Sequence, residues 1–134
     1  MPDGMKFKMK IDKKTLRWFQ KTAPQKLATA KKKAVQAAGM AWADRTKEIT
    51  RNEGHVDTGL YVNSIGYKTG APATDADVVH RINDRHGKTT LITGSNVAYA
   101  SYLEKRFNIM ADGLDQAADR MNKVAQEQIR QAMR

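Results

Sequence analysis

The sequence contains no cysteine, which excludes disulfide bonds, thiolate metal sites and a cysteine nucleophile. It also lacks any apolar run of the roughly 18 residues that a membrane-spanning helix needs. The amino terminus is charged and has no apolar stretch of the kind found in a signal peptide. Together these absences predict a chain that is made in the cytoplasm, stays there and has no membrane contact.

Large apolar side chains are scarce. Leu, Ile, Val and Phe make up 23 of the 134 residues, about 17%, and a fraction below roughly 20% with high net charge is typical of disorder. Here 18 alanines and 7 methionines fill periodic apolar positions instead. We therefore expect one folded domain over residues 1–134, with a thin core that a partner subunit could complete.

Positive charge is abundant and unevenly placed. The formal net charge is +10, and residues 1–35 carry +9 of it. The candidate cations for a polyanion or an acidic partner are Lys21, Lys26, Lys31, Lys32 and Lys33. Three consecutive helical residues fan over about 200°, so residues 31–33 cannot all face one groove. Non-specific contact with DNA, contact with an acidic partner and a simply solvated face all stay open.

The amino-terminal third predicts a strand and then two helices. Residues 6–11 alternate polar and apolar side chains with the period of a half-buried strand, which places a strand within residues 1–11. Asp12 suits the N-cap of a short helix, and Pro24 suits the first turn of a long one. The long helix should end near Glu53 with Gly54 as its C-cap, which makes residues 12–53 a helical, basic region.

Apolar residues at helical spacing mark the buried face of the long helix. The stripe consists of Leu27, Ala30, Ala34, Ala38, Ala41, Trp42, Arg45 and Ile49. Aromatic residues on helices are more often part of the core than of a site. We therefore expect Trp18, Phe19 and Trp42 to pack the long helix onto a sheet.

Residues 56–95 predict a β-rich region. Residues 60–68, with Val62, Ile65 and Tyr67, are expected to form one strand. Residues 78–82 and 89–93 should pair as a hairpin around a turn at residues 83–87. Residues 70–77, rich in turn-forming residues, should form an exposed loop.

Residues 97–134 predict helices again. A short segment at residues 99–107 precedes a final amphipathic helix at residues 109–133. The expected apolar face of that helix is Met110, Leu114, Ala117, Met121, Val124, Gln128 and Ile129. The predicted fold is α+β, with a small, mainly antiparallel β-sheet packed against one long helix and a C-terminal amphipathic helix.

Chemistry-bearing residues give only weak enzyme signals. His55 and Asp57 lie two residues apart and could form an acid–base pair, while His80 and His86 flank the hairpin turn. None of these spacings is a typical metal-ligand pattern, and Gly94-Ser95-Asn96 predicts a turn rather than a phosphate loop. We expect no catalytic residue, no metal and no cofactor.

One motif in the middle of the chain resembles a known family. Val56-Asp57-Thr58-Gly59-Leu60, followed by Ser64-Ile65, is similar to the "VDTG–L–SI" signature of phage tail-completion proteins. These are the neck or head–tail joining proteins of the lambdoid gene-product-ten-like family. Residues 98–104 resemble the family's "YA–Y–E" segment, and the order of elements matches over nearly the whole chain. Residues 105–109 depart from the pattern, because they replace a Phe-Gly-Thr loop and a Pro-rich start of the last helix.

The resemblance implies assembly rather than catalysis. Subunits of the family form a ring, expected here to be a hexamer, between the head connector and the tail tube. The expected neighbours are the head connector or adaptor and the tail terminator or tail tube proteins, with contact to DNA in the lumen left open. The protein would be located in the neck or tail of the virion and made in the cytoplasm of the bacterial host.

The residues themselves give the motif a structural role. Asp57 and Thr58 can hydrogen-bond backbone N–H groups in a turn, and Gly59 allows backbone angles that other residues resist. We therefore interpret residues 56–59 as a structural turn. The interface candidates are Tyr99, Tyr102, Glu104, Pro72 and Asp75, since tyrosines with polar tips are typical of protein-binding surfaces. The alternative to an assembly protein is a small basic protein that binds nucleic acid without sequence preference.

Overall fold

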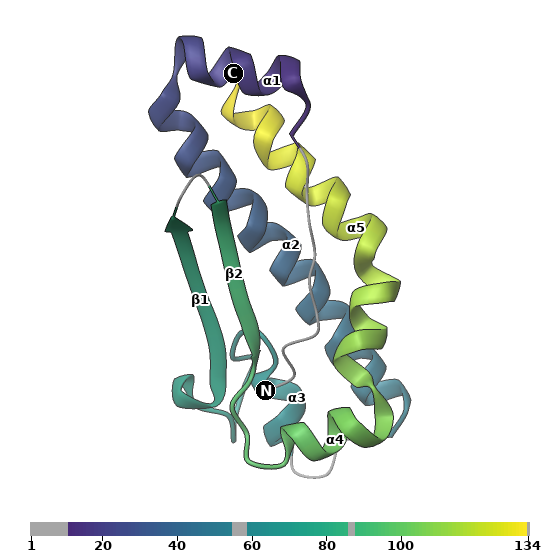
Figure 1. The fold of residues 1–134 in the computed structure, drawn as a ribbon. Helices are drawn as coiled ribbons and strands as arrows, with labels where there is room; N and C mark the ends of the chain where they lie inside the picture. Colours follow the sequence, from purple (N-terminus) through teal and green to yellow (C-terminus); the bar gives the residue numbers. More distant parts are fainter. Residues whose placement is uncertain (1–10, 55–58, 86–87, 134) are drawn as a thin grey trace.

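The structure, a computed structural model, describes residues 11–54, 59–85 and 88–133. Its elements follow one another as shown in Figure 1: α1 (Lys13–Thr22), α2 (Pro24–Asn52), α3 (Leu60–Ser64), a 3-10 turn η1 (Asp75–Asp77), β1 (Val78–Arg85), β2 (Lys88–Ser95), α4 (Ala100–Phe107) and α5 (Ile109–Ala132). The predicted α+β class is confirmed. The strand expected within residues 1–11 and residues 56–58 of the turn motif lie outside the described residues, apart from Ile11.

The amino-terminal helices begin and end as predicted. The carboxylate of Asp12 caps α1 by accepting hydrogen bonds from the backbone N–H and the hydroxyl of Thr15, at 2.8 and 3.0 Å. Pro24 occupies the first turn of α2, which continues for 29 residues, or about 43 Å at 1.5 Å per residue. Gly54 follows the helix with φ +74°, the left-handed conformation that favours glycine at a helix end.

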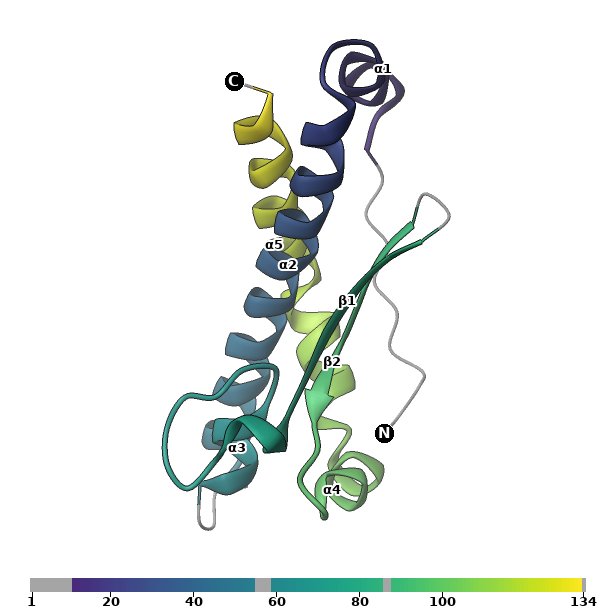
Figure 2. The ribbon, with the colours of Figure 1, turned by 90° about the vertical axis from the view of Figure 1, so that its left-hand side faces the viewer.

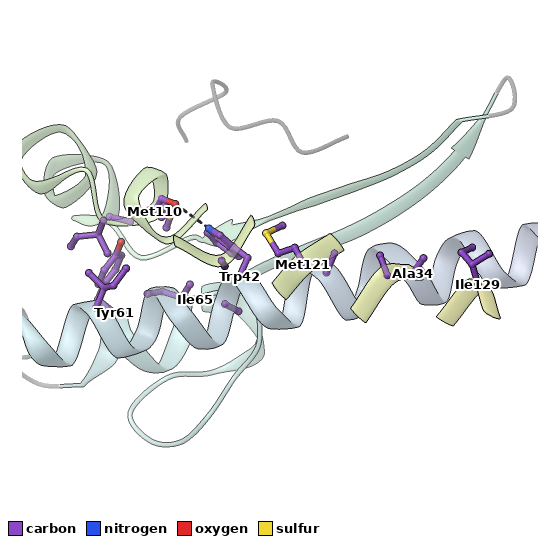
Figure 3. Packing of buried hydrophobic residues seen from close by; sticks show 14 of the residues in the cluster. Ala34, Trp42, Tyr61, Ile65, Met110, Met121 and Ile129 are labelled. Carbon is purple, nitrogen blue, oxygen red and sulfur yellow. Dashed lines mark hydrogen bonds between the residues drawn. The ribbon is translucent and has the colours of Figure 1, made fainter. Parts of the chain in front are cut away.

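α2 and α5 form an antiparallel pair that contains most of the core (Figures 1 and 3). Both helices bury residues at steps of four, and most of these residues are small: Ala30, Ala34, Ala38, Trp42, Thr46 and Thr50 on α2, and Gly113, Ala117, Met121, Ala125 and Ile129 on α5. Small side chains on facing ridges allow two helices to approach closely. The core between these two helices is thus formed by their close approach rather than by many bulky aliphatic side chains.

The aromatic residues pack differently from the prediction. The indole N–H of Trp42 donates a buried hydrogen bond of 3.0 Å to the carbonyl of Met110 in the first turn of α5 (Figure 3). Trp42 therefore joins α2 to α5, a contact that the sequence pattern did not predict. Trp18 and Phe19 contact each other edge to face, with ring centroids 5.0 Å apart, on α1, which packs against α2.

The predicted hairpin is confirmed, with longer strands than expected. β1 and β2 pair antiparallel in a register that sets Val78 opposite Ser95 and Arg85 opposite Lys88. Figure 2 shows the hairpin beside α2, leaning away from it toward the tip. Among the described residues the sheet has only these two strands.

The strand predicted over residues 60–68 is wrong. Residues 60–64 form the helix α3 instead, and the chain then turns back toward β2. Tyr61, Val62 and Ile65 are buried, at spacings of three and four that suit one helical turn. The hydroxyl of Ser64 also lies 2.6 Å from that of Ser95, a buried contact that joins α3 to the end of β2. The apolar pattern of residues 60–68 fits either a strand or a helix, and tertiary contacts determine that residues 60–64 form a helix.

The two carboxy-terminal helices occur where the sequence predicts them, as α4 and α5. The expected apolar face of α5 is correct at Met110, Ala117 and Met121. It is also correct at Ile129, which is buried, and at Leu114, which is half-buried and packs against the core. Two further expected positions are only half-buried: Val124 and Gln128. The buried residues advance in steps of four, which slowly turns the stripe around the helix.

The two helices approach each other closely at Gly113. A Cβ atom built at this position would clash with the hydroxyl of Thr46 and lie 3.2 Å from the Cα of Thr46, which belongs to the backbone of α2. A Cβ at Gly39 would clash only with the terminal Cδ2 of Leu91, a half-buried side chain that can rotate. Both glycines thus lie in helices, but Gly113 faces the backbone of a neighbouring helix, which cannot move easily, whereas Gly39 faces the end of a side chain, which can.

We predict that Gly113→Ala lowers the free energy of unfolding by about 2 kcal/mol, because overpacking against a rigid backbone outweighs the better helix propensity of alanine. Gly39→Ala is the matched control and should change the free energy of unfolding by less than about 1 kcal/mol. Chemical denaturation of both variants measures the difference. Equal stability of the two variants would contradict this account of the helix pair.

Candidate assembly surfaces

The candidate cations lie at one end of the molecule, on α1 and the first third of α2 (Figure 1). We call this the basic end. Lys21, Lys26, Lys32 and Lys33 are exposed there, whereas Lys31 is half-buried. As predicted from the helical fan, residues 31–33 point in different directions.

A shallow groove at the basic end brings two of these lysines together. Lys26 and Lys33 line a cavity of about 480 Å³ between the start of α2 and the end of α5. The other polar residues of its wall are Gln25, Thr29, Gln128 and Gln131, and two alanines complete it. Among the described lining residues none is acidic, so the groove is cationic and rich in amide groups.

Most of the other predicted site residues lie at the opposite end, where α3, α4 and residues 66–77 meet (Figure 1). We call this the base end. Asn96 connects its parts, because its backbone N–H donates to the carbonyl of Asp77 at 2.7 Å and its side chain donates to that of Ala76 at 3.3 Å. Tyr99 follows three residues later.

The tyrosines predicted for an interface are exposed at this base end. Tyr102 is 60% exposed and Tyr99 is 39% exposed, and both are among the exposed large hydrophobic residues of the chain. The ring of Tyr99 lies 6.3 Å from that of the buried Tyr61. Pro72 and Asp75 are exposed on the neighbouring loop. The fold therefore gathers these four candidates at one end.

Gly59 is the only described residue of the turn motif. It has φ +85°, a left-handed conformation that favours glycine, and it precedes the helix α3 rather than a strand. A Cβ at Gly59 would lie 3.3 Å from the amide nitrogen of Asn63 and 3.8 Å from Pro72. Gly59 therefore lies against the loop of the base end.

A polar network fixes that loop to α2 and α3. The side chain of Asn63 donates to the carbonyl of Ala71 at 3.2 Å and accepts from the hydroxyl of Thr69 at 2.8 Å. Lys47 of α2 donates to the same hydroxyl at 3.1 Å and to the carbonyl of Tyr67 at 2.6 Å. These bonds hold the irregular chain after α3 in one position.

Lys47 is a buried charge that the sequence analysis missed. It is 1% exposed, and its ammonium lies 3.7 Å from the centre of the Tyr67 ring. Burial lowers the pKa of Lys47 from 10.5 to about 8, although the nearby Asp44 opposes this shift. The hydroxyl of Tyr67 donates to Asp44, and this bond raises the pKa of Tyr67 to about 12.

Glu104 has a different place from the other interface candidates. It is 7% exposed, and its carboxylate accepts hydrogen bonds from the backbone N–H groups of Met110 and Ala111, at 2.6 and 3.1 Å. It thus caps the start of α5 from the preceding helix. Buried nearby, Tyr61 has its pKa raised by burial and by the charge of Glu104. A carboxylate shortly before a helix start was the sequence signal for this role.

Only one of the enzyme candidates, His80, lies within the described residues. His80 is exposed on β1, while His55, Asp57 and His86 lie outside the described residues. Within the described ranges, no three His, Asp or Glu side chains are grouped so that they could hold a metal ion. A search of the same residues for a helix able to cross a membrane also found none.

We predict that Lys47 makes stability depend on pH. Its pKa is lower in the folded than in the unfolded state, so the unfolded chain binds more protons and stability rises with pH between about 8 and 10. The expected gain is about 2 kcal/mol. Above pH 10 the raised pKa of Tyr67 acts in the opposite sense.

Urea unfolding at pH 7.5, 8.5 and 9.5 measures this effect in the wild type and in Lys47→Met, which lacks the titrating group. The difference between their pH profiles isolates Lys47 from the other lysines. Parallel profiles would contradict the assignment.

Comparison with known proteins supplies a family. A family model described as "Bacteriophage HK97-gp10, putative tail-component" matches residues 12–105, which run from the cap of α1 into α4. Searches of the curated proteins and of the solved structures gave no match. The matched span is more than half of the 134 residues. It includes most of the base end and the α2 side of the groove. The chain therefore belongs to the HK97-gp10-like family of bacteriophage tail components.

Proposed function

We propose that the protein is a structural subunit of the phage neck or tail, which joins the head connector to the tail tube as part of a hexameric ring. The exposed tyrosines at the base end are the observation that carries this proposal. Tyr99 and Tyr102 present large apolar surface on a frame fixed by internal hydrogen bonds. Exposed aromatic residues on a rigid frame are typical of protein-binding surfaces.

The thin core supports the same proposal. Eight of the 19 buried hydrophobic residues that the structure describes are alanines, and each alanine contributes little burial of apolar area. Contact with neighbouring subunits would add the missing apolar burial. Under this proposal the protein performs no bond chemistry, and its activity consists of binding the connector or adaptor on one side and the tail terminator or tail tube on the other.

The pair of substitutions Tyr99→Ser and Tyr102→Ser tests the proposal. We expect incorporation into particles to fall at least tenfold, because the partner loses two aromatic anchors. The free energy of unfolding should fall by no more than about 2 kcal/mol, since Tyr102 is 60% exposed and Tyr99 is 39% exposed. Complementation of a phage that lacks the chain measures incorporation, and electron microscopy locates the protein in the particle.

Met40→Ser is the matched control, because Met40 is an apolar side chain on α2 that is 44% exposed. It should leave incorporation unchanged. Normal particles with the double tyrosine variant, or wild-type protein absent from the neck and tail, would overturn the proposal.

The basic end keeps DNA binding as a second candidate. Lys21, Lys26, Lys32 and Lys33 are exposed and form no ion pair with any described residue. If the assembly proposal holds, binding to random duplex DNA should be weak and should hardly respond to Lys31→Gln, Lys32→Gln and Lys33→Gln together. A salt titration distinguishes the candidates. DNA binding would instead be favoured if the wild type binds tightly and the triple lysine variant lowers the slope of log affinity against log salt concentration by about one to three.

A further inference from the structure

We infer that neighbouring copies of this chain meet head to tail, with an acidic stripe on α5 of one copy in the lysine-lined groove of the next. The inference rests on the proposed ring and names its contact. The groove is the cavity that contains Lys26 and Lys33. The acidic stripe consists of Asp112, Asp115 and Asp119.

The groove is built to accept an anionic helix. Its two lysines lie two turns apart on one face of α2, and the buried Ala30 between them also lines it. Amide groups of Gln128 and Gln131 from α5 face the same space. Among the described residues neither lysine has a salt-bridge partner, so both charges are available to a neighbour.

The acidic stripe lies on α5 at positions i, i+3 and i+7, which share one face of a helix. Asp115 and Asp119 are exposed, Asp112 is half-buried, and none of the three forms an ion pair within the described part of the chain. The buried residues Gly113, Ala117 and Met121 fall on a different face, turned toward α2. The stripe therefore points away from its own groove.

The two surfaces match in length as well as in charge. Lys26 and Lys33 are seven residues apart, and so are Asp112 and Asp119. At 1.5 Å per residue both pairs span about 10.5 Å along their helices. Two helices laid side by side can therefore place cations opposite carboxylates over two turns.

The positions of the surfaces favour a second copy as the occupant. The groove involves the start of α2 and the end of α5, whereas the stripe lies in the first half of α5, so one molecule can use both at once. A contact between two different patches repeats from copy to copy and closes into a ring when the rotation permits. Residues of α5 lie beyond the span that the family model matches, so this contact depends on features of this chain.

Charge reversal tests the contact in assembled particles. The groove variant carries Lys26→Glu and Lys33→Glu, and the stripe variant carries Asp112→Lys and Asp119→Lys, the pair with the same spacing of seven residues. Each should reduce incorporation into particles at least tenfold in complementation of a phage that lacks the chain. A chain with all four changes restores complementary charges and the wild-type net charge, and should return incorporation to within about threefold of the wild type.

Arg85→Glu with Lys88→Glu is the matched control, since both cations are exposed at the far end of the hairpin, outside the groove and outside the base end. It should leave incorporation unchanged. If the wild type enters particles and either single-surface variant does so equally well, or if the fourfold variant is not rescued, the inference is overturned while the proposed function stands. Absence of the wild type from the neck and tail would overturn the proposed function itself.

Discussion

The close approach of α2 and α5 is the constraint on which the rest of the structure depends. Gly113 leaves no room for a Cβ beside Thr46, and alanines at steps of four continue the contact along both helices. Because small residues fill this interface, the two helices form a slender pair, about 43 Å long in α2 and about 36 Å in α5, rather than a globular core. That shape separates the basic end from the base end, so the two candidate surfaces can contact different neighbours.

Buried polar groups, rather than apolar burial, fix the base end. Lys47 holds the chain after α3 through a carbonyl and a hydroxyl, and Glu104 caps α5 through two backbone N–H groups. Each bond satisfies a group that would otherwise be costly to bury. The exposed tyrosines therefore project from a region whose irregular backbone has a defined position, which lowers the entropic cost of binding a partner.

The long helices and the hairpin could be predicted because local signals agreed with the tertiary structure. Asp12, Pro24 and Gly54 mark helix ends. In the hairpin, two strand-like runs of residues lie on either side of a cluster of turn-forming residues. Residues 60–68 could not be predicted reliably, because a short apolar run fits either a strand or one turn of helix. Burial of Ile65 and the contact of Ser64 with Ser95 decide for helix α3, and neither is visible in the local pattern.

The sequence by itself determined the helix ends, the hairpin, the concentration of positive charge and the family, since caps, periodicity and motif are local properties of the chain. Only the tertiary structure decided which residues act together. It buried Glu104 as a helix cap, buried Lys47 beneath the loop and placed Lys26 and Lys33 in a groove completed by α5. The physical reason is that desolvation and hydrogen bonding depend on neighbours far away in the chain, which residue spacing does not specify.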